Sequence, residues 1–512
     1  MYQVDTPLLL IWILLPLAGA VGIALCRNRP NLRESVTLLT STLLAVLVCL
    51  ALPDVISGAR PEWLLASFLP GLDLKLSLEP LGLLFAVVAS CLWIVTSVYA
   101  IGYMRGNNEK HQTRFYICFA VAISGAMGIA AAGNLLTLFF FYEMLTLSTY
   151  PLVAHKGDAK ARAGARMYLG ILLTTSIGFL LPAIVWTWSL ADTVDFRPGG
   201  ILAGTASPGT ISLLFALFLF GTGKAALMPF HRWLPSAMVA PTPVSALLHA
   251  VAVVKAGVFT VTKIAVYVFG TDLLANTDAA TPMLWVAMFT LLGASCVAMT
   301  RDNLKSRLAY STISQLAYVV AGACLASSMG IMGAAMQIPM HAVGKITLFF
   351  CAGAIYTAAH KTEISDMDGL GRVMPVTYIA FLIGALSIIG IPPLGGSWSK
   401  WYLMLGALQA EQLVLIVVLA ISSLLNIAYL LPIVARGFFR PLPDEPAIRV
   451  TATGEPMPRR AMQEAPVAML VPLSLTALGC ALLFFHADIV LNLITPILDT
   501  GADTVLTAGA HP

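Results

Sequence analysis

Apolar residues gather in long uninterrupted runs along this chain, and polar residues fall between the runs. A helix that spans a bilayer needs about 20 predominantly apolar residues, and the sequence contains about fourteen runs of that kind. Their approximate limits are 7–26, 34–53, 80–103, 114–132, 134–154, 166–190, 211–229, 242–268, 281–300, 305–327, 330–357, 373–393 with an extension to 409, 411–435 and 466–486. The pattern predicts an all-α polytopic membrane protein with about 14 transmembrane helices.

Composition excludes an ordinary soluble enzyme. Of the 512 residues, 59% are hydrophobic and 11% are charged, and the mean hydropathy is +0.87, whereas soluble domains carry about 25% charged residues. The net charge of +4 is spread over the whole chain and gives no indication of a nucleic-acid partner. All eight cysteines lie in apolar runs without metal-ligand spacing, so they are expected to be small buried hydrophobes, with no metal and no cofactor.

Lysine and arginine are distributed unevenly between the two sets of loops. Loops after odd-numbered runs hold 21 of the 29 basic residues, and loops after even-numbered runs hold three, namely Arg60, Lys75 and Arg197. Because cytoplasmic loops collect basic residues, the odd-numbered loops are expected to face the cytoplasm and both termini the other side. No basic residue precedes the first run, so we expect no cleaved signal. The setting expected is a bacterial or archaeal cytoplasmic membrane.

The longest hydrophilic stretch, from Arg436 to Gln463, reads as a proline-rich cytoplasmic linker. It is too short for a catalytic domain. The activity of the protein is therefore expected to lie within the membrane.

Several charged residues interrupt the apolar runs, although an ionised side chain near the bilayer centre costs about 2.5 to 3.5 kcal/mol on insertion scales. Taken singly, each could be a structural ion pair or a lysine that reaches toward the interface. A set on different helices, with too few acids to pair the lysines, favours a proton relay, because burial lowers the pKa of an unpaired lysine and a nearby carboxylate raises it again. The set comprises Glu143, Lys224, Lys255, Lys345 and Lys400, whereas Lys263 is read as extending to the far interface.

Two runs are broken by glycine and proline beside a lysine. The seventh contains GTGKAALMPFHRWLP around Lys224, and the twelfth contains GIPPLGGSWSK before Lys400. Broken helices occur in membranes where the freed backbone groups are buried in protein or line a wet cavity, although glycine and proline are also common in membrane helices. Five helices separate the breaks, which predicts two inverted five-helix repeats, helices 4–8 and 9–13, with discontinuous helices 7 and 12.

Two histidines accompany the lysines. His341 and Lys345 are four residues apart and share a helical face. Two roles for His341 therefore stay open: a member of the proton relay, or a packed, hydrogen-bonded residue. His249 and Lys255 are six residues apart and point in different directions, so they need not act together. Nearby serines and threonines either hold water between the charges or make contacts between helices: Thr146, Ser148, Thr149, Ser311, Thr312 and Ser314.

Four segments carry a resemblance that covers nearly the whole chain: FFFYEMLTLSTYPL, GKAALMPFHRWLPSAMVAPTPVSALLHAVAVVKAG, LKSRLAYSTISQLAY and HAVGKITLFFCAGAI. They are similar to the antiporter-like subunits shared by respiratory complex I, membrane-bound hydrogenases and Mrp-type cation/proton antiporters. The resemblance implies that Glu143 and Lys224 form the charge pair of a first half-channel and that Lys255 bridges toward the centre. It also implies that the histidine and lysine of the eleventh run continue the polar axis and that Lys400 serves the exit of a second half-channel.

Within that superfamily the chain most resembles an Mrp D-type subunit. Its length, Lys400 and the segment HKTEISDMDGLGRVMP are similar to that type, whereas a long lateral helix or a glutamate at the Lys400 position marks other types. The segment PTPVSALLHAVAVVKAG is closer to the larger A-type subunits. The expected organisation is helices 1–3 in residues 1–110, one repeat in 111–270, the second in 271–437, and the linker with helix 14 in 438–512.

The function expected from this resemblance is that of a transporter subunit and not an enzyme. It would translocate protons in a multisubunit antiporter, in exchange for Na+ or a similar monovalent cation, beside other membrane subunits in the lipid bilayer. The alternative is a proton-pumping subunit in the membrane arm of a complex I-like or hydrogenase-type redox complex. A third reading is a passive scaffold with an unused relay.

Overall fold

A computed structural model of the protein describes residues 2–69, 72–442 and 463–498. The predicted linker falls largely in residues 443–462, outside the described residues, together with Arg449, Arg459 and Arg460. The side chain of His249 is likewise outside what the structure describes.

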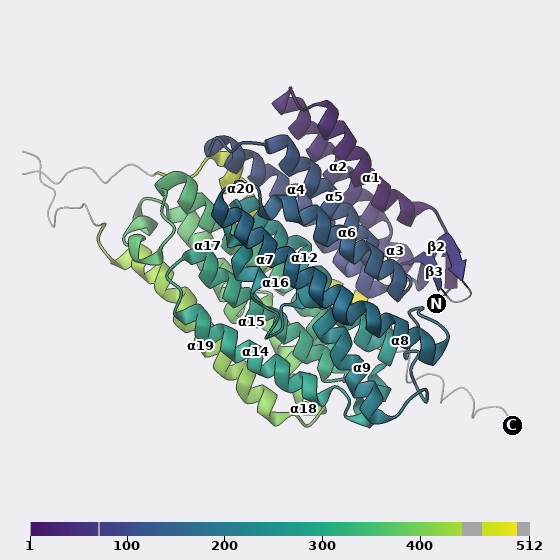
Figure 1. The fold of residues 1–512 in the computed structure, drawn as a ribbon. Coiled ribbons are helices and arrows are strands. Elements are labelled where there is room, and N and C mark those ends of the chain that lie inside the picture. The colour runs from purple at the N-terminus through teal and green to yellow at the C-terminus, as the bar shows by residue number, and fades with distance from the viewer. Residues whose placement is uncertain (1, 70–71, 443–462, 499–512) are drawn as a thin grey trace, which may run out of the picture.

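Each of the fourteen predicted runs contains a helix, and the helices form an elongated bundle (Figure 1). A backbone in lipid must satisfy its own hydrogen bonds, which is why these apolar runs fold as helices. The helices of the first half are α1 (Leu8–Leu25), α2 (Pro30–Leu50), α3 (Leu52–Ile56), α4 (Pro80–Gly106), α5 (Gln112–Ala130), α6 (Leu135–Val153), α7 (Ala159–Thr175), η1 (Ser176–Leu180), α8 (Leu181–Ala191), α9 (Pro208–Gly221), η2 (Gly223–Ala225), α10 (Trp233–Ser236), η3 (Ala237–Val239), α11 (Thr242–Ala246), η4 (Leu247–Val251), α12 (Val253–Ile264) and η5 (Ala265–Phe269).

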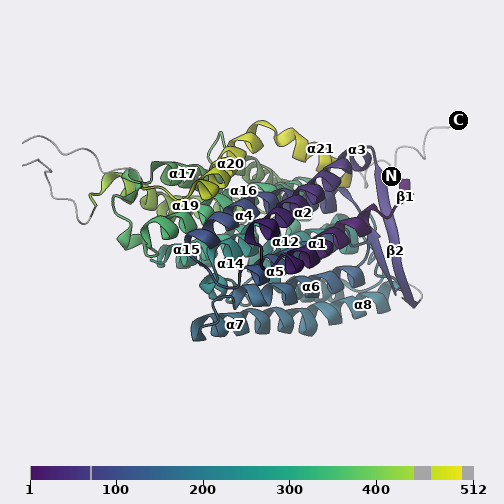
Figure 2. The ribbon, with the colours of Figure 1, turned by 90° about the horizontal axis from the view of Figure 1, so that it is seen from above.

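The second half of the chain adds further helices to the same bundle. Figure 2 places α7 and α8 along one face of the bundle and α20 and α21 along the opposite face. The helices are α13 (Thr271–Thr277), α14 (Thr281–Met299), α15 (Leu304–Cys324), α16 (Ser328–Ala359), η6 (Ile364–Asp366), η7 (Leu370–Arg372), α17 (Pro375–Ile389), α18 (Gly396–Gln409), α19 (Leu413–Phe439), α20 (Val467–Phe485) and α21 (Ala487–Leu498).

Ten of the described helical spans are long and apolar enough to cross a membrane, and an eleventh results if the bent pair Val253–Phe269 and Thr271–Thr277, which meet at 81°, counts as one span. Among the other predicted spans, α9 and α17 are shortened by breaks. Serine, threonine and glutamine lower the hydropathy of α15. The prediction of fourteen spans and of two inverted repeats therefore stays a prediction.

A small β-sheet covers one end of the bundle, at the right of Figure 2. Strand β1 (Tyr2–Asp5) pairs parallel to β2 (Ala59–Leu69), and β2 pairs antiparallel to β3 (Leu72–Ser77). The hydrophobic pattern predicts only a loop in this stretch, so the strands are a local addition to the mostly helical fold. Arg60 lies in β2 and Lys75 in β3, which places two of the three sparse basic residues at this end.

Two loops extend the cover that the sheet provides. The Ser77 amide donates to the Ala131 carbonyl at 2.8 Å, and the Arg197 amide donates to the Tyr267 carbonyl at 3.1 Å. The first bond joins β3 to the loop after α5, and the second joins the loop 192–201 to η5. We call this region the sheet end, and it comprises β1, β2, β3 and residues 131–134 and 192–201.

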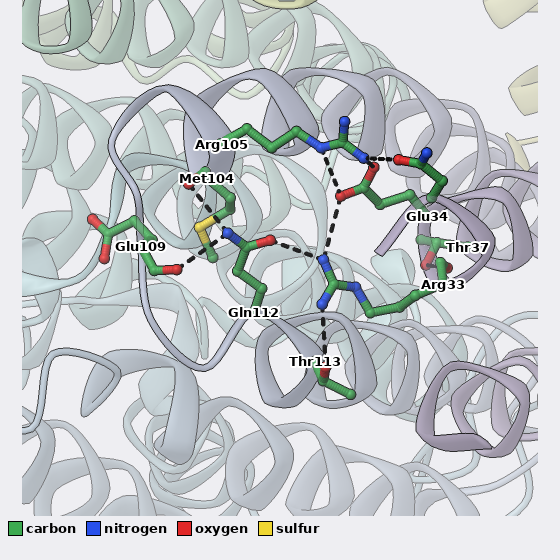
Figure 3. A network of polar contacts seen from close by, with 9 residues as sticks. Arg33, Glu34, Thr37, Met104, Arg105, Glu109, Gln112 and Thr113 are labelled. Atoms are coloured by element: carbon green, nitrogen blue, oxygen red, sulfur yellow. Dashed lines mark hydrogen bonds and ion pairs between the residues drawn. The ribbon is translucent and has the colours of Figure 1, made fainter. Parts of the chain in front are cut away.

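An ion network with a buried centre at Arg33 and Glu34 ties three helices together at the opposite end of the bundle (Figure 3). Glu34 on α2 accepts from Arg105 on α4, whose Nε lies 3.2 Å from Oε1, and it also pairs with Arg33 at 3.3 Å. Arg33 donates to Gln112 at 2.8 Å and to Thr113 at 3.2 Å, both on α5. The positions of the apolar runs assign Arg33 and Arg105 to loops, whereas the structure places both inside helix ends.

Helix α16 forms the centre of the bundle and is almost completely buried. Among its neighbours are α4, α12, α15, α17, α18 and α20. Because it touches so many helices, it is the element through which polar groups on the two halves of the chain can meet.

Candidate functional site

The lysines within the apolar runs lie inside the bundle. Lys224, Lys255, Lys263 and Lys345 are fully buried, and Lys400 is 7% exposed. Lys263 does not extend to the interface as expected, because its Nζ pairs with Glu79 at 2.5 Å inside the protein. A buried charge persists in a membrane protein when it is paired or faces a polar interior, so the partners of each lysine define the site.

Lys224 sits at the predicted break in the seventh run. Helix α9 ends at Gly221, and the short turn η2 turns the lysine toward α6. Its Nζ donates to the Tyr142 carbonyl at 2.8 Å and to the Thr146 hydroxyl at 2.6 Å, and it lies 3.1 Å from the centre of the Tyr142 ring. The Lys224 amide donates to the Tyr142 hydroxyl at 3.0 Å, so this tyrosine holds both the backbone and the amine.

Glu143 lies beside this contact without entering it. Within the described residues both of its carboxylate oxygens are buried and make no hydrogen bond, and the carboxylate interacts with Lys224 only through space. In this structure, the charge pair that the resemblance implies is therefore an electrostatic interaction without a hydrogen bond. An adjustment of the Glu143 side chain would change how strongly the carboxylate stabilises a buried ammonium at Lys224.

Gly257 permits a close contact between α12 and the break. A Cβ built there would lie 2.4 Å from the Ala225 amide nitrogen and from the Lys224 carbonyl carbon. Only a residue without a side chain fits, since both neighbours are backbone. The glycine thus brings the helix of Lys255 against the turn of Lys224.

Gly257→Ala is accordingly expected to destabilise the protein by about 1–3 kcal/mol through overpacking. The measurement is the thermal unfolding temperature of the purified complex that contains this chain, in mild detergent. Gly170→Ala on α7 is the matched control, because a Cβ there meets nothing within 4 Å. An unchanged unfolding temperature for Gly257→Ala would show that α12 and η2 separate freely.

Lys255 contacts His341 across the bundle. The Lys255 Nζ and His341 Nδ1 atoms are 2.6 Å apart, which joins α12 to α16. His341 and Lys345 lie four residues apart on α16, as the spacing predicts, and the His341 ring reaches across to a lysine of another helix. Lys345 interacts with Lys255 through space.

Lys345 begins a chain of hydroxyl groups. Its Nζ donates to Ser311 Oγ on α15 at 2.6 Å, and the Tyr429 hydroxyl on α19 donates to the same oxygen at 2.8 Å. Tyr429 also bonds Asn426 one turn earlier. Ser311 therefore makes a contact between helices, one of the two roles considered for the serines and threonines, and it bonds Lys345 of α16.

Lys400 stands at the second predicted break. Between α17 and α18 the chain is non-helical, and Gly390 has φ +90°. A Cβ at Gly390 would lie 2.7 Å from the Lys400 side chain, so the absence of a side chain at Gly390 leaves room for the lysine. The Lys400 Nζ donates to the Ile389 carbonyl at 2.7 Å and to Ser423 Oγ on α19 at 3.0 Å, and it lies 5.0 Å from the centre of the Tyr318 ring.

Lys400 also borders an apolar cavity of about 590 Å³ lined by residues of α17, α18 and α19 and by Phe484 of α20. A second polar link leads away from its helix. Ser399 Oγ donates to Gln337 Oε1 at 2.5 Å, and the Gln337 amide donates to Gln315 at 2.9 Å. The end of the lysine row is thus connected to α15 and α16 as well as to α19.

The structure gathers the sequence-predicted lysines into one row that crosses the bundle, and His341 belongs to it. The row runs from α6 and η2 through α12, α16 and α15 to α19 and α18. Sequence reasoning missed Tyr142 and Ser423, which bond lysines directly, and Tyr429, which bonds the serine that holds Lys345. Tyr142 adjoins Glu143, whereas nothing in the sequence marks the other two.

Comparison with known proteins adds a family and a fold. The sequence profile of the family described as "NADH:quinone oxidoreductase/Mrp antiporter, TM" matches residues 132–426. NADH-quinone oxidoreductase subunit N of Desulforudis audaxviator is 32% identical over 450 residues, 86% of either chain. The A subunit of the Na(+)/H(+) antiporter of Alkalihalophilus pseudofirmus is 29% identical over 477 residues, which cover 86% of this chain and 56% of that one.

A solved structure agrees with the arrangement of the helices. A chain of the Mrp complex from Dietzia sp. DQ12-45-1b superimposes with a TM-score of 0.80 over 98% of both chains, at 21% sequence identity. At that identity the likeness concerns the fold.

Proposed function

Because this chain belongs to the NADH:quinone oxidoreductase/Mrp antiporter family of membrane subunits, we propose that it is the proton-translocating subunit of a multisubunit antiporter that exchanges protons for Na+ or a similar monovalent cation. Other membrane subunits of the same complex would be its partners. The odd-numbered loops would face the cytoplasm, and the sheet end would face outside.

One observation supports this proposal above all others. Four buried lysines from the two halves of the chain follow one another through the centre of the bundle, each held by a carbonyl, a hydroxyl or an imidazole. Titratable residues inside a membrane protein mark proton relays because amines, imidazoles and hydroxyls can accept and donate protons in turn. A structural role alone does not require such a row.

The relay would begin at Lys224. A carboxylate close to a buried ammonium stabilises the charged form, and its withdrawal favours release of the proton. Movement of Glu143 would therefore set when Lys224 gives up its proton. Lys255 with His341, then Lys345 with Ser311, would carry protons on toward Lys400.

A second candidate is a proton-pumping subunit of a complex I-like or hydrogenase-type redox assembly. The observation that favours it is the NADH-quinone oxidoreductase relative, which this chain covers over 86% of its length, against 56% for the Na(+)/H(+) antiporter relative. In that case the same lysines would carry protons, and the energy would come from electron transfer in other subunits.

The test uses the intact complex, isolated in mild detergent through a tag on this chain and reconstituted into vesicles with a trapped pH dye. We expect a Na+ or K+ gradient alone to drive proton movement, with small membrane proteins co-purifying. Proton movement that requires NADH or another reductant, with iron–sulfur or nickel subunits co-purifying, would favour the second candidate. Absence of proton movement under both conditions would contradict both.

A further inference from the structure

One buried ion pair lies outside the lysine row. The Lys263 Nζ is 2.5 Å from Glu79 Oε1 and donates to the Ala132 carbonyl at 2.6 Å. The Lys263 side chain is fully buried, and that of Glu79 is 5% exposed. This pair joins the end of α12 to the start of α4 directly beneath the sheet end.

The surroundings of the pair carry an excess of positive charge. Arg60 of β2 interacts electrostatically with both Glu79 and Lys263, so two cations face one carboxylate. The Lys263 amine also lies 4.5 Å from the ring centre of Phe196, in a loop of the sheet end.

The same helix carries Lys255, eight residues before Lys263. On an ideal helix the two lysines are about 12 Å apart along the axis and roughly 80° apart around it. Phe259 lies halfway between them and stacks on Phe85 of α4, with ring centres 5.0 Å apart. The Lys263 amine is 5.4 Å from the Phe259 ring. This aromatic stack therefore lies beside the Lys263 amine, on the stretch of α12 that joins the two lysines.

The helix around the two lysines departs from regular α geometry. The π-helical turn η4 precedes Lys255, and the π-helical turn η5 follows Lys263. Such turns frequently occur at functional sites in helices. The segment that carries both lysines is bounded by these two turns.

We propose that Glu79 and Lys263 form a proton-exchange site between Lys255 and the sheet end, and that the Phe85–Phe259 stack closes the connection between them. The inference rests on the proposed function, because the site would give protons on the lysine row a second route to the outside. That route would leave the row at Lys255, in the first half of the chain. Rotation of the Phe259 ring would open the connection.

The chemistry is a pair of balanced proton transfers. An N–H bond of the Lys263 ammonium breaks and an O–H bond forms on Glu79, which leaves a neutral amine and a neutral carboxylic acid. Glu79 then loses its proton to water at the sheet end, and the Lys263 amine takes the next proton from Lys255. The reverse order carries protons inward.

The experiment compares variants of the reconstituted complex. The double variant Glu79→Gln/Lys263→Met removes both titratable groups and leaves no unpaired buried charge between them. We expect it to assemble and to lose about 10-fold in cation-driven proton exchange, less than the roughly 100-fold or more that a positioned acid–base group contributes. Glu34→Gln in the network at the opposite end is the matched control and should remain within about 2-fold of the unmodified complex.

A second measurement concerns the aromatic stack. Phe259→Ala is expected to raise the passive proton leak of the proteoliposomes several-fold, and adding Glu79→Gln/Lys263→Met should remove that leak. A structural ion pair would leave the leak unchanged. This measurement decides the matter if the double variant does not assemble, since Phe259→Ala alone with an unchanged leak would overturn the proposal.

Lys224→Met, measured in parallel, separates the two levels of inference. If that variant loses exchange while Glu79→Gln/Lys263→Met keeps it, the exchange site is wrong and the proposed relay stands. If Lys224→Met keeps exchange, the proposed function itself fails.

Discussion

Lys224→Met is expected to reduce proton translocation by the complex at least about 100-fold, within the range that positioned acid–base groups contribute. Methionine has a similar length and cannot carry a proton, and the Tyr142 carbonyl and Thr146 hydroxyl would lose the donor they now share. The measurement is the initial rate of dye-reported proton movement in proteoliposomes, at equal amounts of assembled complex.

Lys224→Arg distinguishes a moving proton from a fixed charge. A guanidinium keeps the positive charge but does not deprotonate in proteins, so this variant should be as slow as Lys224→Met. The exposed Lys110 provides the control, and Lys110→Met should transport normally. Full activity of Lys224→Arg would show that the charge, and not a proton on Lys224, matters.

Lys345→Met is expected to cause a loss of the same size, because Lys345 lies between the pair formed by Lys255 and His341 and the hydroxyl chain that leads to α19. Tyr429→Phe should cause a smaller loss of about 10-fold, since it removes the donor to Ser311 while the lysine keeps its own bond to that serine. Rates and complex yield are measured as for Lys224.

The two variants together test whether the hydroxyl chain carries protons. If Tyr429→Phe reaches normal rates while Lys345→Met does not, protons leave Lys345 by another route, for example through Gln337 and Ser399. If both variants are normal, the second half of the lysine row takes no part in transport.

Sequence reasoning located the lysines and the two breaks because a charge or a proline in an apolar run stands out against its neighbours. It could not assign partners. His341 and Lys345 share a face by spacing, yet His341 contacts Lys255 from a helix 86 positions earlier, and Lys345 turns to Ser311. Periodicity gives the direction of a side chain on its own helix and says nothing about which helix lies opposite.

The same limit explains the mistaken expectation about Lys263. Lys263 looks like a lysine near the end of a run, and its partner Glu79 follows a strand that the hydrophobic pattern does not reveal. The charge pair of Glu143 and Lys224 is what the family resemblance implies, and the structure gives the two groups an electrostatic interaction without a hydrogen bond.

Helix α15 holds many polar residues, including Ser311 and Gln315, and its hydropathy falls short of that of the clear spans. A nascent segment of that kind partitions weakly into lipid by itself. It packs closely on α14, where Ser295 and Ser314 bond at 2.9 Å. During synthesis α15 would therefore be retained in the bilayer as a hairpin with α14, so the polar residues of the proposed relay would also constrain the order in which the chain is inserted.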